Sequence, residues 1–213
     1  MAIGPPFQVH RTDAEVARIR DGATVVPASP AVFRVEGPGA LTCLQGLLTN
    51  DLEKPGPGSL VYGALLTPKG MIVLDLWVLR DAGGFTLIAP AESREAAAGL
   101  FKRSLPPRLA RVTDQTGEWT TAWLLGANVA ERGALAGLGE FPDPGVAVAR
   151  GAEGESFQLA AGTTAAWFRG VLVGPTGVVA AATVRLGMAE VTVGTPDDAT
   201  VARVLAGWPA LGA

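Results

Sequence analysis

One charged side chain interrupts an apolar run in the first half of the chain. Asp75 lies in the middle of Met71–Leu79, whose other members are all apolar. Such a run is typical of a half-buried strand, and its alternation places Asp75 on the same face as Trp77 and three other apolar residues. Because an unpaired buried carboxylate is costly, Asp75 needs a hydrogen-bond donor, a bound proton or a ligand.

A tyrosine is the predicted partner of this carboxylate. The Thr-Pro-Lys-Gly sequence at 67–70 suits a type I turn, since Pro is favoured at the second position and Gly at the fourth. If the middle two residues are the turn centre, Leu66 pairs with Met71, and counting outward sets Tyr62 opposite Asp75. Directly paired side chains lie about 5 Å apart at Cβ. The pair either binds a ligand or satisfies itself as a structural contact.

The composition argues against several other kinds of site. The 213 residues include one Cys and one His, so the chain can form neither an internal disulfide nor a Cys/His zinc site. A net charge of -3 disfavours a nucleic-acid partner, whose phosphates need a basic face. No signal-peptide core is found, and no run approaches the roughly 20 apolar residues of a membrane span. We therefore expect a cytoplasmic protein with no metal, nucleic-acid or membrane partner.

The predicted elements indicate an α+β fold with flanking helices. Hydrophobic residues make up 48% of the chain, enough for a sizeable core. In the first half we expect a strand at 31–35, a helix at 40–48, strands at 60–66, 71–79 and 85–89, a helix at 91–104 and a strand at 109–112. In the second half we expect a strand at 119–125, a helix at 129–138, a hairpin at 146–160, a helix at 163–172, a strand at 178–184 and a helix at 199–205.

The two series have the same order: strand, helix, strands, helix, strand. A repeated order predicts two related halves with mixed or antiparallel sheets, packed about a pseudo-two-fold axis. We expect an N-terminal arm at 1–30 with a short helix at 13–20, a first half at 31–115 and a second half at 116–213. The groove between the halves is the natural ligand site.

Several motifs of the first half resemble the glycine-cleavage T-protein (aminomethyltransferase) superfamily. They are Val-Glu-Gly-Pro at 35–38, Leu-Gln-Gly-Leu-Leu-Thr-Asn-Asp-Leu at 44–52, Tyr62, Lys-Gly at 69–70 and Leu-Asp-Leu at 74–76. The Pro-Lys-Gly turn at 68–70 is more similar to the YgfZ-type folate-binding branch, because T-proteins have Gly-Gly there. The resemblance extends over residues 32–185 and is strongest at 35–80.

The resemblance implies a fold and a ligand. In the family, two related α+β halves hold tetrahydrofolate or a one-carbon derivative in a central channel. Asp75 matches the family's essential carboxylate, which makes it the implied catalytic residue, and Tyr62 matches the tyrosine beside the pterin. Asn50, in the Thr-Asn-Asp-Leu motif, either contacts the ligand or belongs to a turn with local hydrogen bonds after the helix. Trp77 packs either on a ligand ring or in the core.

Two further ligand contacts are implied in the second half. Arg185 matches an arginine that contacts the folate. Gln158 stands where T-proteins place a glutamate on the pterin, and it gives up the charge-assisted hydrogen bond of a carboxylate.

The chain also departs from the family. Leu74 replaces the first Asp of a family Asp-Asp pair, and the YgfZ signature Lys-Gly-Cys-Tyr-x-Gly-Gln-Glu is absent. The sequence stops near the point where that signature and a C-terminal β-barrel would begin. These departures favour a shortened member of the superfamily.

Three functions are therefore open. The first is tetrahydrofolate binding, with a role in one-carbon metabolism or in folate-dependent maintenance of iron–sulfur proteins. The second is aminomethyltransferase activity proper. The third is a non-catalytic T-protein-like subunit or interaction module, with a protein partner covering the face left by the missing barrel.

Overall fold

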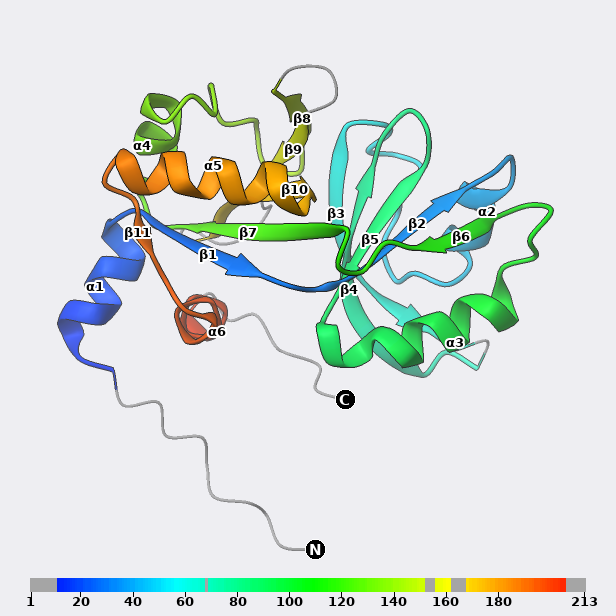
Figure 1. Cartoon of the computed structure of the whole chain (residues 1–213). Coiled ribbons are helices and arrows are strands. Elements are labelled where there is room, and N and C mark those ends of the chain that lie inside the picture. The colour runs from blue at the N-terminus through cyan, green and yellow to red at the C-terminus, as the bar shows by residue number, and fades with distance from the viewer. Residues whose placement is uncertain (1–10, 68, 152–155, 162–167, 206–213) are drawn as a thin grey trace, which may run out of the picture.

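The computed structural model describes residues 11–67, 69–151, 156–161 and 168–205, which form two β-sheets with flanking helices (Figure 1). Two elements come first: α1 (Asp13–Asp21) and β1 (Thr24–Ala28). The first half then comprises β2 (Ala31–Glu36), α2 (Ala40–Gln45), β3 (Ser59–Leu66), β4 (Ile72–Arg80), β5 (Phe85–Ala89), the 3-10 turn η1 (Ala91–Ser93), α3 (Arg94–Ser104) and β6 (Arg111–Asp114). The second half comprises β7 (Trp119–Leu125), α4 (Val129–Leu135), β8 (Ala147–Arg150), β9 (Phe157–Ala160), β10 (Phe168–Pro175), α5 (Thr176–Met188), β11 (Thr192–Val193) and α6 (Pro196–Leu205).

The two sheets repeat one topology. The five-stranded sheet has the order β3-β4-β5-β2-β6, and the six-stranded sheet has the order β8-β9-β10-β7-β1-β11. The second order reproduces the first element by element, except that β1 is inserted between β7 and β11. The predicted α+β fold with two related halves is confirmed.

The expected N-terminal arm contributes to the second sheet. The predicted helix at 13–20 is present as α1, which begins with a capping box between Thr12 and Glu15. β1 was not expected, since the arm was predicted to contain only a short helix, and β1 includes Pro27. However, β11 pairs only with Thr24 and Val25, so β1 has a free edge from Val26 onward, where a missing N–H costs no sheet hydrogen bond. The domain boundaries themselves remain a prediction.

The prediction for 163–184 was wrong where the structure describes it. The expected helix at 163–172 overlaps β10, although residues 162–167 lie outside the described residues. The expected strand at 178–184 lies inside α5. Three valines suggested a strand there, but the buried residues of this segment are Val179, Ala182 and Leu186, a helical spacing. Burial of one face against the sheet outweighed local β-propensity.

Three apolar clusters fix the layers. One lies between the five-stranded sheet and the helices α2 and α3, and another between the six-stranded sheet and the helices α4 and α5. The third lies where the inner faces of the two sheets meet, together with residues of α1 and α6. Figure 1 shows α5 and α6 on opposite sides of the six-stranded sheet. Within the described residues, no helix is long and apolar enough to cross a membrane.

Candidate functional site

The β3–β4 hairpin places Tyr62 and Asp75 in a register that differs from the predicted one. The turn is closed by hydrogen bonds from Gly70 N to Thr67 O and from Thr67 N to Met71 O, both 2.8 Å long. A bulge then follows, and Ala64 lies opposite Asp75 while Tyr62 lies opposite Trp77.

The predicted direct pairing of Tyr62 with Asp75 was therefore wrong by two residues. The turn is one residue wider than assumed on the β4 side, and the bulge at Val73 adds the second residue. A shift of two keeps every side chain on its face, so Tyr62 is a diagonal neighbour of Asp75.

Asp75 is a buried carboxylate with a phenol donor. Its exposed fraction is 4%, and the Tyr62 hydroxyl donates a hydrogen bond of 2.6 Å to Oδ2. Burial raises the pKa of Tyr62, the hydrogen bond to Asp75 and its charge raise it further, and Arg203 partly offsets the effect. The phenol therefore stays protonated at neutral pH and acts as a donor.

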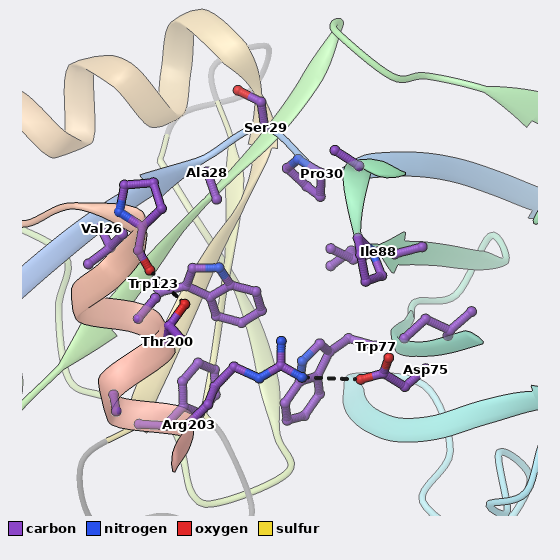
Figure 2. Close-up of a pocket in the computed structure, with 18 of the residues that line it drawn as sticks. Val26, Ala28, Ser29, Pro30, Asp75, Trp77, Ile88, Trp123, Thr200 and Arg203 are labelled. Atoms are coloured by element: carbon purple, nitrogen blue, oxygen red, sulfur yellow. Dashed lines mark hydrogen bonds and ion pairs between the residues drawn. The ribbon is translucent and has the colours of Figure 1, made fainter. Parts of the chain in front are cut away.

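A second donor reaches the same oxygen from the other half of the molecule. Arg203 Nη2, in the last turn of α6, lies 3.3 Å from Asp75 Oδ2 and forms an ion pair with it. Figure 2 shows this guanidinium extending from α6 across to Asp75 on β4. Sequence reasoning missed Arg203, because a single arginine on a helix 128 positions away carries no signal of this contact.

The two donors leave Asp75 Oδ1 available. Within the described chain, the hydrogen bonds to this carboxylate both end on Oδ2. Among the residues that the structure describes, the buried side-chain atoms without a hydrogen-bond partner are Gln115 Oε1, Thr121 Oγ1 and Arg150 Nε. Asp75 Oδ1 is not among these buried atoms without a partner, and Asp75 lines a cavity. An acceptor oxygen of a fixed carboxylate thus faces space that a ligand can fill.

The cavity has a volume of about 450 Å³, within the range of small-molecule sites. It lies where the two sheets meet, and α6 forms one wall (Figure 2). Its charged lining residues in the described part of the chain are Asp75, Glu92 and Arg203. The other lining residues are mainly apolar. The lining residues come from β1, β3, β4, β5, η1, β7, β10 and α6 and from the loops beside them.

Among the described residues, four aromatic rings line this cavity. Trp77 and Phe168 are stacked, with centroids 5.5 Å apart and planes 19° apart. Tyr62 lies 5.1 Å from Trp77, and Trp123 lies 5.0 Å from Phe168. All four line the cavity and pack in the cluster between the sheets. A flat, weakly polar ring could pack against such a surface while it donates a hydrogen bond to Asp75.

Comparison with known proteins places the chain in a family. Residues 6–134 match the sequence profile of the GCVT N-terminal domain, which is more than half of the chain. The chain belongs to the GCVT family.

Relatives within the GCVT family are longer than this chain. The aminomethyltransferase of Rubrobacter xylanophilus is 32% identical over 146 residues, which are 64% of this chain and 38% of the relative. The aminomethyltransferase of Synechococcus sp. (strain WH7803) is 33% identical over 122 residues, or 53% of this chain and 33% of the relative. The chain thus spans less than two fifths of either relative.

A solved structure shows the same fold. The glycine cleavage system aminomethyltransferase T from Bartonella henselae matches with a TM-score of 0.68 and 24% identity, over 81% of this chain and 47% of that chain. The matched GCVT profile includes β3 and β4, with Tyr62 and Asp75, but ends before α6 and Arg203.

The predicted site residues divide into two groups. Tyr62, Asp75 and Trp77 line the cavity together. Asn50 lies on the other side of Tyr62: its Nδ2 donates to Tyr62 O at 3.0 Å, and both residues line a neighbouring cavity of about 500 Å³.

The structure does not bring Gln158 and Arg185 to this cavity. Gln158 is half-buried in β9 and is not a lining residue. Arg185 is exposed on α5, which covers the opposite face of the six-stranded sheet.

Proposed function

We propose that this protein binds a reduced folate, tetrahydrofolate or a one-carbon derivative of it, in the cavity between its two sheets. The observation that carries the proposal is the geometry of Asp75. Its Oδ2 is held by two donors from opposite halves, and its Oδ1 faces the cavity beside an aromatic surface. Membership of the GCVT family supports the choice of ligand.

The residues present suit a pterin. The pterin edge carries N–H donors, which match an ionised carboxylate oxygen in a charge-assisted hydrogen bond. Its flat ring suits the surface formed by Tyr62, Trp77 and Phe168. Asp75 would then orient a ring nitrogen and bias its protonation, which is the catalytic role proposed for it. Trp77 and Tyr62 would contact the ring. Asn50 would hold Tyr62 in place by donating a hydrogen bond to the backbone carbonyl of Tyr62.

A second candidate is aminomethyl transfer to the bound folate. The names of the two relatives favour it. Folate-dependent iron–sulfur protein maintenance requires the same folate binding but no transfer. An assay with an aminomethylated lipoyl carrier protein and tetrahydrofolate separates the two: ammonia release that depends on Asp75 supports transfer, and inertness while folate still binds removes it.

A cytoplasmic location and a protein partner also remain proposals. Such a partner would cover the face against which the family's C-terminal barrel packs. Size-exclusion chromatography of the purified chain, with and without the native cell extract, tests whether the chain binds such a partner. A monomer that captures nothing would argue against a partner.

Calorimetric titration with 5-formyltetrahydrofolate tests the central proposal. Wild type should show saturable one-site binding. Asp75→Asn should weaken it by about tenfold or more, since a hydrogen bond to a charged acceptor contributes about 1.5–3 kcal/mol. Glu131→Gln removes a carboxylate from the exposed side of α4 and should leave affinity unchanged. Lack of binding at high micromolar concentration, with a native circular dichroism spectrum, would rule the proposal out.

A further inference from the structure

The position of Arg203 assigns it a role beyond simple packing. We propose that Arg203 is a positioning residue, which holds the Asp75 carboxylate from the opposite half of the molecule so that Oδ1 is presented to the cavity. The consequence for ligand affinity rests on the proposed folate site. The contact between Arg203 and Asp75 does not, and it can be tested alone.

The first support is the direction from which Arg203 comes. Val201 and Ala202, its neighbours on α6, are buried against the inner face of the six-stranded sheet. Asp75 belongs to β4 of the other sheet. The ion pair therefore connects two elements that are otherwise held in different layers, and both of its residues line the cavity (Figure 2).

The second support is that α6 is anchored firmly at its beginning. Asp198 is only 2% exposed, and its Oδ2 accepts a hydrogen bond of 2.8 Å from Thr195 N. Its Oδ1 pairs with Arg18 at 2.9 Å and with Arg11 at 3.4 Å. The helix α6, which carries Arg203, is thus held by an ion pair to Arg18 of α1 and by a hydrogen bond to Thr195, the residue before α6. A side chain on a fixed helix can position a group more precisely than one on a loop.

The third support is the choice of oxygen. A carboxylate with one donor can tilt about that bond. Two donors converging on Oδ2, Tyr62 at 2.6 Å and Arg203 at 3.3 Å, fix the plane of the group. Tyr62 reaches Oδ2 from the neighbouring strand, and Arg203 reaches it from the opposite wall. With Oδ2 held in this way, the other oxygen, Oδ1, is directed toward the cavity. Arg203 also balances the charge of Asp75, so the site favours a neutral N–H donor over a cationic amine.

The closing experiment has a ligand-free arm. Thermal unfolding is measured for wild type, Arg203→Met, Asp75→Asn and the double variant. If the two side chains act together, Arg203→Met lowers Tm in the wild type, and at most half of that loss remains in the Asp75→Asn background. Equal losses in both backgrounds would overturn the proposal, whatever the ligand.

The ligand arm uses 5-formyltetrahydrofolate. Arg203→Met should weaken binding by about fivefold to tenfold, a modest loss because the Arg203 side chain is 36% exposed. Arg203→Lys should recover most of the affinity, since an ammonium group can also donate a hydrogen bond to Asp75 Oδ2. Arg103→Met removes an arginine from the last turn of α3, away from the cavity, and serves as the matched control.

The outcomes separate the two claims. Recovery by Lys supports positioning through charge and hydrogen bonding, whereas a Lys variant as weak as Met would overturn it in favour of a packing role. If wild type does not bind the folate but the unfolding cycle shows coupling, the proposed function fails and the positioning role stands.

Discussion

The hydrogen bond from Tyr62 to Asp75 makes a quantitative prediction for Tyr62→Phe. This change deletes one hydroxyl and keeps the ring that packs on Trp77. A hydrogen bond to a charged acceptor contributes about 1.5–3 kcal/mol, but Arg203 remains on the same oxygen and water can enter the cavity. We therefore expect a loss of about 1–2 kcal/mol. For a chain of this size each kcal/mol lowers Tm by about 2–4 °C, so Tm should fall by about 2–8 °C.

The assay for this prediction is thermal unfolding followed by circular dichroism at pH 7, in two backgrounds. In Asp75→Asn the acceptor is neutral, and the cost of Tyr62→Phe should be at least halved. Two results would refute the reasoning. One is an unchanged Tm in Tyr62→Phe, and the other is the same loss whether residue 75 is Asp or Asn.

Three more predictions follow from the same structure. Because the pKa of Tyr62 is raised on folding, its stabilisation is complete below the ordinary tyrosine pKa of 10.0 and is lost as pH rises beyond it; the Tm difference between wild type and Tyr62→Phe should shrink in alkaline buffer. Burial raises the pKa of Asp198, but the Thr195 backbone hydrogen bond and the charge of Arg18 outweigh it and lower the net pKa. Asp198→Ala should therefore cost about 2–4 kcal/mol at pH 7, measured by urea unfolding, and the cost should shrink as pH falls below 4. Gly126 has φ +94°, and an added Cβ would meet a backbone carbonyl before β1; Gly117 has φ +90° with open space around it. Gly126→Ala should thus lower Tm clearly more than Gly117→Ala, and equal losses would contradict the packing described.

Much of the fold could be predicted because the local signals agreed with the tertiary structure. The strands β3 and β4 are apolar runs buried along most of their length, and the residues of the turn between them were recognisable. The order of elements in the first half was also correct. Prediction failed at α5, where valines in a helix bury one face against a sheet, and at β1, whose proline is tolerated only because β11 is short. Both depend on which neighbours an element meets, and this is not encoded locally.

The parts of the candidate site that depend on local sequence could be predicted, and the parts that depend on tertiary packing could not. A carboxylate inside an apolar strand is a local feature, and the tyrosine on the neighbouring strand followed from the turn. The exact register required the bulge at Val73, which carries no sequence signal. Arg203 could not be found, since only the packing of α6 between the sheets brings it to Asp75. Arg185 was assigned by motif alone, and the helix that holds it faces away from the cavity.

A crystal structure with 5-formyltetrahydrofolate soaked in tests the central claim most directly. We expect the ring system in the cavity between the sheets, with one of its N–H groups within hydrogen-bond distance of Asp75 Oδ1 and one face on the aromatic surface beside Trp77. A folate bound elsewhere, or one in this cavity that leaves Oδ1 without a ligand contact, would contradict the account.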